Sequence, residues 1–477
     1  MTLGIVLLLA EAFIPTKGKA WLGLAGSAGL LVILGLLPIA TGPDGNNADW
    51  PLWNFYQHDQ MAVFYKGFAM VTTILVLLMS VDYRAILSRF TDFPDSENGT
   101  GEYYSLPIFA CAGMMWLASA KDLAGAFVAL ELVTITFYVM VAFMRRNLGS
   151  VEAGVKYLIL GALSTGFLVY GIAWIYGTTH TLSFEQLATA IPAVESTTPL
   201  LFGIALVLIG LAFKVGAVPM QIWIPDVYQG APTPTTAFLS VASKAAGFIL
   251  LIRFLDPMLA TSITSAPVLF ILFLLTAATL IYGNLGAIAQ SNFKRLLAYS
   301  SIAHAGFLLL ALSAGKTGSQ ADTLNSNQVV SFYLATYLIM TLGAFFVMAQ
   351  VRIQRDGEEI SHFDGLGKTN PRLALALTVL MASMAGVPLT AGFVGKFLAF
   401  SIAIDAKLWL AIGMAFIGAA AGFYYYFKVI RAMWVLEPQD AAVIKVPVIS
   451  SICISVLTVA TIVLGFWPQP ILWLIGY

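Results

Sequence analysis

The sequence predicts an all-α polytopic membrane protein with about fourteen transmembrane helices in a single membrane domain, residues 1–477. Three observations support this prediction: the composition is strongly apolar, the apolar stretches have the length of a membrane span, and two stretches that contain charges are interrupted by proline. Hydrophobic residues make up 59% of the chain and charged residues 10%, with a mean hydropathy of +0.88. Because soluble domains contain about 25% charged residues, a soluble globular fold is excluded.

The charge balance and the cysteines exclude several classes of function. Lys plus Arg and Asp plus Glu both total 24, so no basic or acidic excess indicates a nucleic-acid partner or a membrane-surface role. Cys111 and Cys453 lie far apart in apolar stretches, without the CxxC spacing of iron–sulfur, haem or zinc sites. No GxGxxG or Walker A motif is present for a nucleotide. We therefore expect no cofactor and no metal in this chain.

A transmembrane helix needs about 20 mostly apolar residues. Such stretches are expected at 1–15, 20–40, 61–81, 104–119, 121–144, 151–177, 199–219, 235–256, 266–290, 295–315, 328–351, 372–402, 408–436 and 446–474. The first lacks a basic segment and a small-residue cleavage site, so we expect a retained helix rather than a signal peptide. The glycines of 23–31 are expected at close helix contacts, and the aromatic residues in lipid-facing and interfacial belts.

The positions of the basic residues predict the orientation. Fifteen of them lie in or beside the loops that follow odd-numbered spans: Lys17, Lys19, Arg84, Arg89, Arg145, Arg146, Lys294, Arg295, Arg352, Arg355, Lys368, Arg372, Lys428, Arg431 and Lys445. The other side has Lys66, Lys121, Arg253, Lys316 and Lys407. Since cytoplasmic loops are enriched in Lys and Arg, we expect the odd loops to be cytoplasmic and both termini to face outward.

A few ionisable residues lie inside the expected spans, where a charge costs about 2.5–3.5 kcal/mol at the helix centre. They are Lys156, Lys214, Lys244, Lys396, Glu131 and His304. Such residues persist where they face a hydrated interior and have partners, so we interpret them as the functional residues of the chain. Three alternatives stay open. Lys156 lies near a boundary and can snorkel to the headgroups, Glu131 can form a purely structural ion pair, and His304 can be a satisfied core residue.

Two expected spans are interrupted in a similar way, by Pro219 in the seventh and Pro388 in the twelfth. A proline frees a backbone carbonyl that needs protein or water as a partner, so both are expected to be broken helices beside a polar interior. Glu131 precedes Pro219 by 88 residues and His304 precedes Pro388 by 84. This spacing predicts two five-helix repeats, 104–256 and 266–436, in inverted orientation because five is odd. Gly392 and Gly395 are expected to leave the twelfth span locally open.

A row of lysines between a glutamate and a histidine suits protons better than organic solutes. Burial lowers the pKa of a lysine and a nearby carboxylate raises it, so a moving charge can load or empty each site. Moving one proton against a membrane potential costs about 2.3 kcal/mol per 100 mV. Because the sequence has no motif for a nucleotide or a redox centre, we expect the energy to come from another subunit.

Several long strings resemble the antiporter-like subunits of bacterial respiratory complex I, the proton-pumping NADH:quinone oxidoreductase, and among them subunit N. They include LELVTITFYVMVAFMRRN, VEAGVKYLILGALSTGFLVYGIAWIYG, LAFKVGAVPMQIWIPDVYQGAPTPTTAFLSVASKAAGF, GNLGAIAQSNFKRLLAYSSIAHAGF and LMASMAGVPLTAGFVGKF, and the resemblance is strong over roughly 100–435. Ala231 and Lys244 match subunit N rather than the two larger antiporter-like subunits. Gln229 departs from the family pattern, which commonly has glutamate there.

The resemblance implies a role for each intramembrane residue. Glu131 and Lys214 resemble the fifth-helix glutamate and seventh-helix lysine that couple neighbouring subunits. Lys244 resembles the central lysine of the eighth helix, His304 the polar relay of the tenth and Lys396 the lysine beside the exit path in the twelfth. Lys156 matches a lysine of the sixth helix.

The resemblance also implies partners, cofactors and location. We expect the other membrane subunits of complex I and the lipid bilayer as partners, no nucleic acid, and NADH, FMN, iron–sulfur clusters and quinone in other subunits. The expected location is the bacterial inner membrane, with both termini periplasmic. A subunit of a multi-subunit cation/proton antiporter is the main alternative. A solute transporter would need a polar pocket at the repeat interface, and a structural anchor would leave the buried lysines unexplained.

Overall fold

The computed structural model describes residues 1–15, 18–39, 51–92, 94, 96–315, 324–438 and 442–476. All regular elements in these ranges are helices, joined by three isolated β-bridges. The α-helices are α1 Thr2–Glu11, α2 Ala20–Leu36, α3 Gln60–Arg89, α4 Glu102–Ala118, α5 Leu123–Val141, α6 Leu148–Thr179, α7 Phe184–Ala190, α8 Thr197–Val215, α9 Ile224–Gly230, α10 Thr233–Phe238, α11 Lys244–Leu259, α12 Ser262–Ile288, α13 Phe293–Ser313, α14 Ser326–Arg355, α15 Leu366–Thr369, α16 Pro371–Ala385, α17 Ala391–Asp405, α18 Trp409–Val435, α19 Val448–Phe466 and α20 Gln469–Leu474.

Eleven helices of the described residues are long and apolar enough to cross a membrane, and this confirms the predicted all-helical membrane class. Two shorter apolar helices, α1 and α16, fall below that length. Lys17, Lys316 and residues 40–50 lie outside the described residues.

Polar caps define where several helices begin. Asp122 accepts a hydrogen bond from the Gly125 amide at the start of α5, and Asn147 caps α6 in the same way. Asn325 and Gln328 form a reciprocal capping box at the start of α14. Each cap satisfies amide groups that the first helical turn leaves without a partner, so these helix starts are encoded locally.

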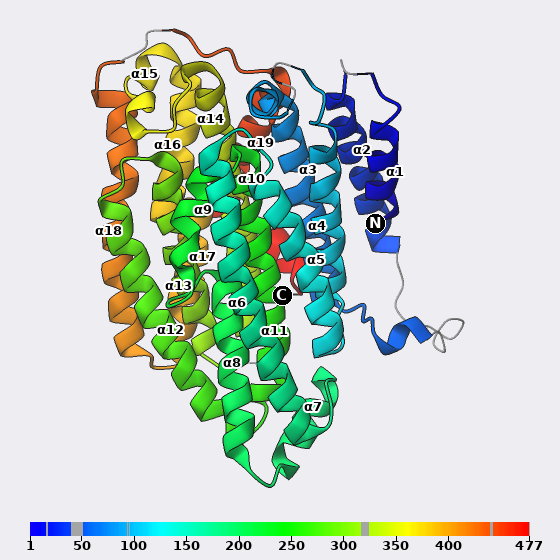
Figure 1. The fold of residues 1–477 in the computed structure, drawn as a ribbon. Coiled ribbons are helices and arrows are strands. Elements are labelled where there is room, and N and C mark those ends of the chain that lie inside the picture. The colour runs from blue at the N-terminus through cyan, green and yellow to red at the C-terminus, as the bar shows by residue number, and fades with distance from the viewer. Residues whose placement is uncertain are drawn as a thin grey trace.

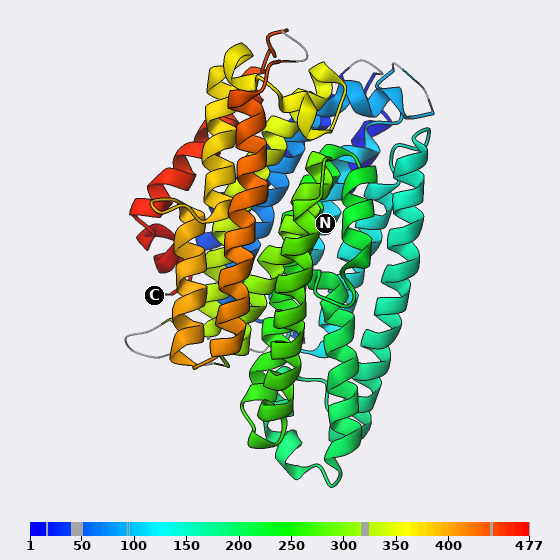
Figure 2. The same ribbon diagram turned by 90° about the vertical axis from the view of Figure 1, so that its left-hand side faces the viewer.

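The connections between helices gather at two ends of the bundle (Figures 1 and 2). At one end, near α7, the Leu123 amide donates to the Leu182 carbonyl over 2.9 Å, and Tyr56 pairs with Ala120. At the opposite end, near α15, Asn292 pairs with Glu359. We call these the α7 end and the α15 end. The connections at the α15 end are the ones that hold most of the basic residues.

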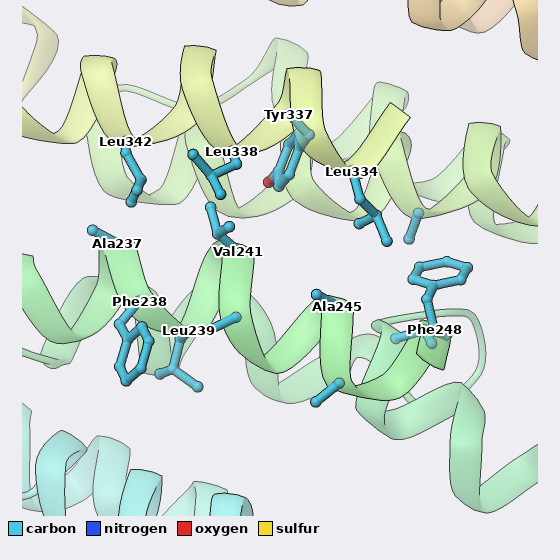
Figure 3. Packing of buried hydrophobic residues seen from close by; sticks show 14 of the residues in the cluster. Ala237, Phe238, Leu239, Val241, Ala245, Phe248, Leu334, Tyr337, Leu338 and Leu342 are labelled. Atoms are coloured by element: carbon cyan, nitrogen blue, oxygen red, sulfur yellow. The ribbon is translucent and has the colours of Figure 1, made fainter. Parts of the chain in front are cut away.

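The centre of the bundle is one continuous helical segment, Thr233–Leu259, whose apolar window is entirely buried. It consists of α10, a π-helical turn at Leu239–Ser243, and α11. Figure 3 shows the side chains of Val241 and Ala245 facing α14, where Leu334, Tyr337 and Leu338 lie. A π-helical turn interrupts the regular hydrogen-bond pattern of an α-helix, and the turn at Leu239–Ser243 ends directly before Lys244.

The glycines of 23–31 lie at close helix contacts, as predicted. A Cβ on Gly23 would stand 2.8 Å from Val81, and one on Gly29 would stand 2.8 Å from Leu3. The prediction for the aromatic residues is wrong for a group of tyrosines. Tyr333, Tyr337, Tyr425 and Tyr426 are all buried in the bundle. Their apolar rings pack well there, and their hydroxyl groups find polar partners inside the protein.

Candidate functional site

The helix α8 ends at a glycine that lets the chain leave the bundle axis. Gly216 has a φ of +79°, and its amide donates to the Phe213 carbonyl while the Ala217 amide donates to the Ala212 carbonyl. This pair of bonds is the Schellman motif, which requires the left-handed conformation that glycine adopts easily. The chain then passes Pro219 and continues as α9.

The helix α16 ends in the same way. Gly386 has a φ of +92°, its amide donates to the Ser383 carbonyl, and the Val387 amide donates to the Ala382 carbonyl. After Pro388 the chain continues as α17. In both places a helix C-terminus, where the backbone dipoles concentrate negative charge, lies inside the bundle and favours a cation.

Lys214 lies in the last turn of α8 and is buried. Its Nζ donates to Thr134 Oγ1 over 2.7 Å and lies 3.8 Å from Glu131 Oε1. Glu131 also accepts a hydrogen bond of 3.0 Å from Thr165. The two charges therefore form the pair that the sequence predicted, with hydroxyl groups on both sides. The Thr134 hydroxyl is the nearer partner of the lysine, and the Glu131 carboxylate is the farther one.

Lys244 follows the π-helical turn and is buried at the start of α11. Its Nζ donates to the Ser301 carbonyl of α13 and lies 5.1 Å from the ring centre of Tyr337. No carboxylate among the described residues forms an ion pair with it. A buried ammonium held only by a carbonyl and an aromatic face is costly to keep charged, which suits a group that gains and loses a proton.

His304 lies within α13 and is hydrogen-bonded through both ring nitrogens. Nδ1 is 2.7 Å from the hydroxyl of Tyr333, and Nε2 is 3.1 Å from the hydroxyl of Tyr426. The Tyr426 hydroxyl is also bonded to Ser300. Tyr337, which contacts Lys244, has its ring centre 4.9 Å from that of His304. The histidine thus links Lys244 with a group of buried tyrosine hydroxyls.

Lys396 lies on α17 and is bound by the C-terminus of α16. Its Nζ donates to the carbonyls of Met384 and Ala385 over 2.8 and 2.9 Å. It also lies 5.1 Å from the ring centre of Phe307, one helical turn beyond His304. We call Glu131, Lys214, Lys244, His304 and Lys396 the polar row. Glu131 is partly exposed and the other four are buried. The structure pairs Glu131 with Lys214, and it places the Tyr337 ring beside both Lys244 and His304.

Lys156 lies apart from the polar row. It is partly exposed at the α15 end, where its Nζ lies 2.8 Å from both Glu152 and Asp226. Asp226 also pairs with Arg295 over 2.7 Å. The structure therefore places Lys156 in an ion-pair network at the surface end of α6.

Sequence reasoning missed two parts of this site. The tyrosines around His304 were expected at the membrane surface, and no signal in the sequence of one helix distinguishes a buried tyrosine from a surface one. Lys294 was counted among the loop charges, yet its side chain is only 2% exposed and pairs with Glu358 over 2.8 Å. Its place in the first turn of α13, directly before an apolar stretch, was the available signal.

A polytopic helical bundle with buried lysines at two helix breaks defines a class of protein, the membrane ion translocators. A family model described as NADH:quinone oxidoreductase/Mrp antiporter, transmembrane, matches residues 120–422. The chain belongs to this family.

Named relatives and solved structures agree with this assignment. NADH-quinone oxidoreductase subunit N of Desulforamulus reducens is 37% identical over 98% of this chain and 94% of its own length. A chain of respiratory complex I from Thermus thermophilus, solved with bound aureothin, is 31% identical, with a TM-score of 0.78 over 99% of this chain and 97% of its own. A chain of the Mrp complex from Dietzia sp. has a TM-score of 0.79 at 20% identity, over 100% and 94% of the two chains, and shows the fold alone.

Proposed function

We propose that this chain is an antiporter-like, non-redox membrane subunit of a bacterial proton-translocating NADH:quinone oxidoreductase. The observation that supports this best is the polar row, whose titratable groups alternate with hydroxyl groups and aromatic faces from Glu131 to Lys396. Protons cross the membrane through these groups, and quinone reduction elsewhere in the complex drives them. The Mrp antiporter alternative rests on fold likeness at 20% identity, whereas the relatives named subunit N reach 37%.

The partners and cofactors follow from this assignment. The chain contacts other membrane subunits of the complex, a neighbouring antiporter-like subunit among them. NADH, FMN, the iron–sulfur clusters and quinone bind to other subunits. Among the described residues there is no group of three or more His, Cys, Asp and Glu side chains that could hold a metal.

The proposed topology has about fourteen crossings, with the seventh and twelfth discontinuous. The seventh comprises α8 and α9, and the twelfth comprises α16 and α17. The matching Schellman motifs at Gly216 and Gly386 support a repeat relation between 104–256 and 266–436, and five helices in each repeat would make the second copy inverted. The packing agrees, since α4 packs on α5 and α6 on α8 in one repeat, as α12 packs on α13 and α14 on α16 in the other.

We further propose that the α15 end is cytoplasmic and that both termini are periplasmic, as the excess of basic residues at that end supports. Single-cysteine variants made in a Cys111→Ser, Cys453→Ser background test this orientation. A cysteine at Asn147, in the α5–α6 connection, should react with a membrane-impermeant maleimide only in inverted vesicles. A cysteine at Thr181, in the α6–α7 connection, should react only in right-side-out vesicles. The reverse labelling pattern would overturn the orientation.

Replacing Lys244 with methionine tests the proposed function. The variant keeps a flexible side chain of similar length but has no amine to protonate, so we expect the assembled complex to lose most of its proton pumping. Lys66→Met is the matched control, because Lys66 is equally buried but lies at the α7 end with Tyr56 and His58. Proton uptake into inverted vesicles, normalised to complex content, is the measurement. Unchanged pumping by Lys244→Met would contradict the proposal.

A further inference from the structure

A polar pocket opens at the α15 end, above the polar row. Its volume is about 550 Å³, and its lining includes Lys156, Asp226, Tyr83, Lys294 and Glu358. The pocket is formed where the C-terminal end of α3 and the helix α9 meet the starts of α6 and α13 and the loop after α14. It therefore brings water and charged groups to the point where the continuous segment Thr233–Leu259 begins.

Lys294 lies on the inner side of this pocket. Its side chain is 2% exposed, whereas that of its partner Glu358 is 18% exposed and belongs to the pocket wall. The Nζ of Lys294 also donates to the Ala231 carbonyl over 2.9 Å, at the connection between α9 and α10. The ion pair thus lies at the inner wall of the pocket, with the carboxylate more exposed than the amine.

Backbone contacts hold Glu358 in position independently of its side chain. The Phe293 amide donates to the Glu358 carbonyl over 2.8 Å, and the Ile360 amide donates to the Ser291 carbonyl over 2.8 Å. Asn292 donates to Glu359 over 3.1 Å. Because three bonds pin this loop to the start of α13, a change at the Glu358 carboxyl group should leave the loop in place.

The hydroxyl groups of Tyr228 and Ser301 are hydrogen-bonded to each other, and Ser301 is the residue whose carbonyl binds Lys244. Ser301 is two helical turns beyond Lys294 on α13, which places both on one face about 10 Å apart. The hydroxyl of buried Tyr228 is 3.2 Å from the Ser301 hydroxyl, and the Ser301 carbonyl accepts the hydrogen bond from Lys244. Tyr228 directly precedes Gln229, whose carbonyl accepts a hydrogen bond of 3.4 Å from Lys294.

We infer that Lys294, paired with Glu358, is the relay through which protons pass from the pocket at the α15 end into the polar row. The Lys294 ammonium gives a proton, by way of the Tyr228 and Ser301 hydroxyls, to the neutral amine of Lys244. A proton from the pocket converts the Glu358 carboxylate to the acid, which then reprotonates Lys294. One proton has entered, and the ion pair is restored. This inference rests on the proposed function, since it supplies the entry to the same row.

The charge-conserving variant Lys294→Arg tests the relay. Arginine keeps the positive charge and the pairing with Glu358, but the pKa of its side chain is too high for proton release near neutral pH. We expect the variant to assemble and its pumping rate to fall at least about tenfold, because a positioned proton-transfer group commonly contributes about 10²–10⁴-fold. A lysine with a purely structural role would tolerate the replacement, and wild-type pumping by Lys294→Arg would overturn the inference.

Two further sets of variants test the relay without altering Lys294. Glu358→Gln should pump slowly and Glu358→Asp should retain more activity, whereas the neighbouring Glu359→Gln should pump normally.

Tyr228→Phe should lower the rate by a smaller factor, because water can replace a single hydroxyl. Tyr103→Phe is its control, since the Tyr103 hydroxyl is equally buried but bonds to Thr235, away from Lys244. Equal loss in Tyr228→Phe and Tyr103→Phe would contradict the route.

The Lys244→Met variant separates this inference from the proposed function. If Lys244→Met stops pumping while Lys294→Arg, Glu358→Gln and Tyr228→Phe all pump as the wild type does, the relay is wrong and the proposed function stands. If Lys244→Met itself pumps normally in the assembled complex, the proposed function fails.

Discussion

The variant Lys214→Ala should lose most proton pumping in an assembled complex, and electron transfer should fall with it where coupling is tight. Removing one partner of a buried ion pair leaves the other charge uncompensated, at a cost of about 3–5 kcal/mol. In this chain Glu131 would keep only the 3.0 Å hydrogen bond from Thr165. Glu131→Ala should have a similar effect, because Lys214 would keep only Thr134.

A double-mutant cycle distinguishes a working pair from two independent residues. Glu131→Gln, Lys214→Met and the double variant should show non-additive losses, since the two atoms are 3.8 Å apart and share one hydrogen-bond network. Glu185→Gln, on the exposed helix α7, controls for the loss of a carboxylate elsewhere. The readout is proton uptake and quinone reduction in inverted vesicles, after complex content has been measured. Normal pumping by a fully assembled Glu131→Ala variant would exclude the pair as a functional element.

The variant Lys396→Arg should assemble and yet pump poorly, with Lys396→Ala at least as impaired. Arginine supplies a permanent cation for the Met384 and Ala385 carbonyls but does not release a proton near neutral pH. The structure provides room for the larger head, because Lys396 borders a pocket of about 540 Å³ with Phe397 and Phe400 in its wall. Hence a pumping defect in Lys396→Arg would reflect proton exchange rather than a steric clash.

The three forms separate proton exchange from fixed charge at this position. Proton uptake into inverted vesicles, per assembled complex, is compared for wild type, Lys396→Arg and Lys396→Ala. Wild-type pumping by the arginine form beside an inactive alanine form would mean that the lysine acts only as a fixed positive charge at the end of α16.

The open space beside Lys396 does not come from the glycines of α17, as the sequence suggested. Gly392 and Gly395 were expected to leave the twelfth span open, but both are buried, and a Cβ on Gly392 would lie 2.0 Å from the Ser383 carbonyl oxygen. A Cβ on Gly395 would lie 3.1 Å from Thr336 Oγ1. The glycines therefore bring α17 close to α16 and α14, and the open space lies on the side of α18.

Local sequence signals were sufficient for the all-helical membrane class and for locating the ionisable residues within apolar stretches. Apolar length predicted the spanning segments, and caps such as Asp122 and Asn147 are encoded next to the helices that they start. Lys214, Lys244 and Lys396 lie inside apolar stretches, and the cost of a charge in hydrocarbon was enough to identify them as functional candidates. The position of Glu131 at mid-span indicated only that it needs a cation, and the resemblance to the family implied that this cation is Lys214.

The sequence by itself determined that this chain is a helical membrane protein with a small set of costly buried charges, because apolar length and charge burial are properties of single segments. Only the tertiary structure decided which partners those charges have. In the tertiary structure, Tyr333 and Tyr426 are hydrogen-bonded to the two ring nitrogens of His304. Lys156 pairs with Asp226 apart from the polar row, and Lys294 is buried against Glu358. Such contacts join residues 29 to 122 positions apart, and they depend on how each helix rotates about its axis when it packs. Hydropathy does not reveal that rotation, because lipid and the protein interior are similarly apolar.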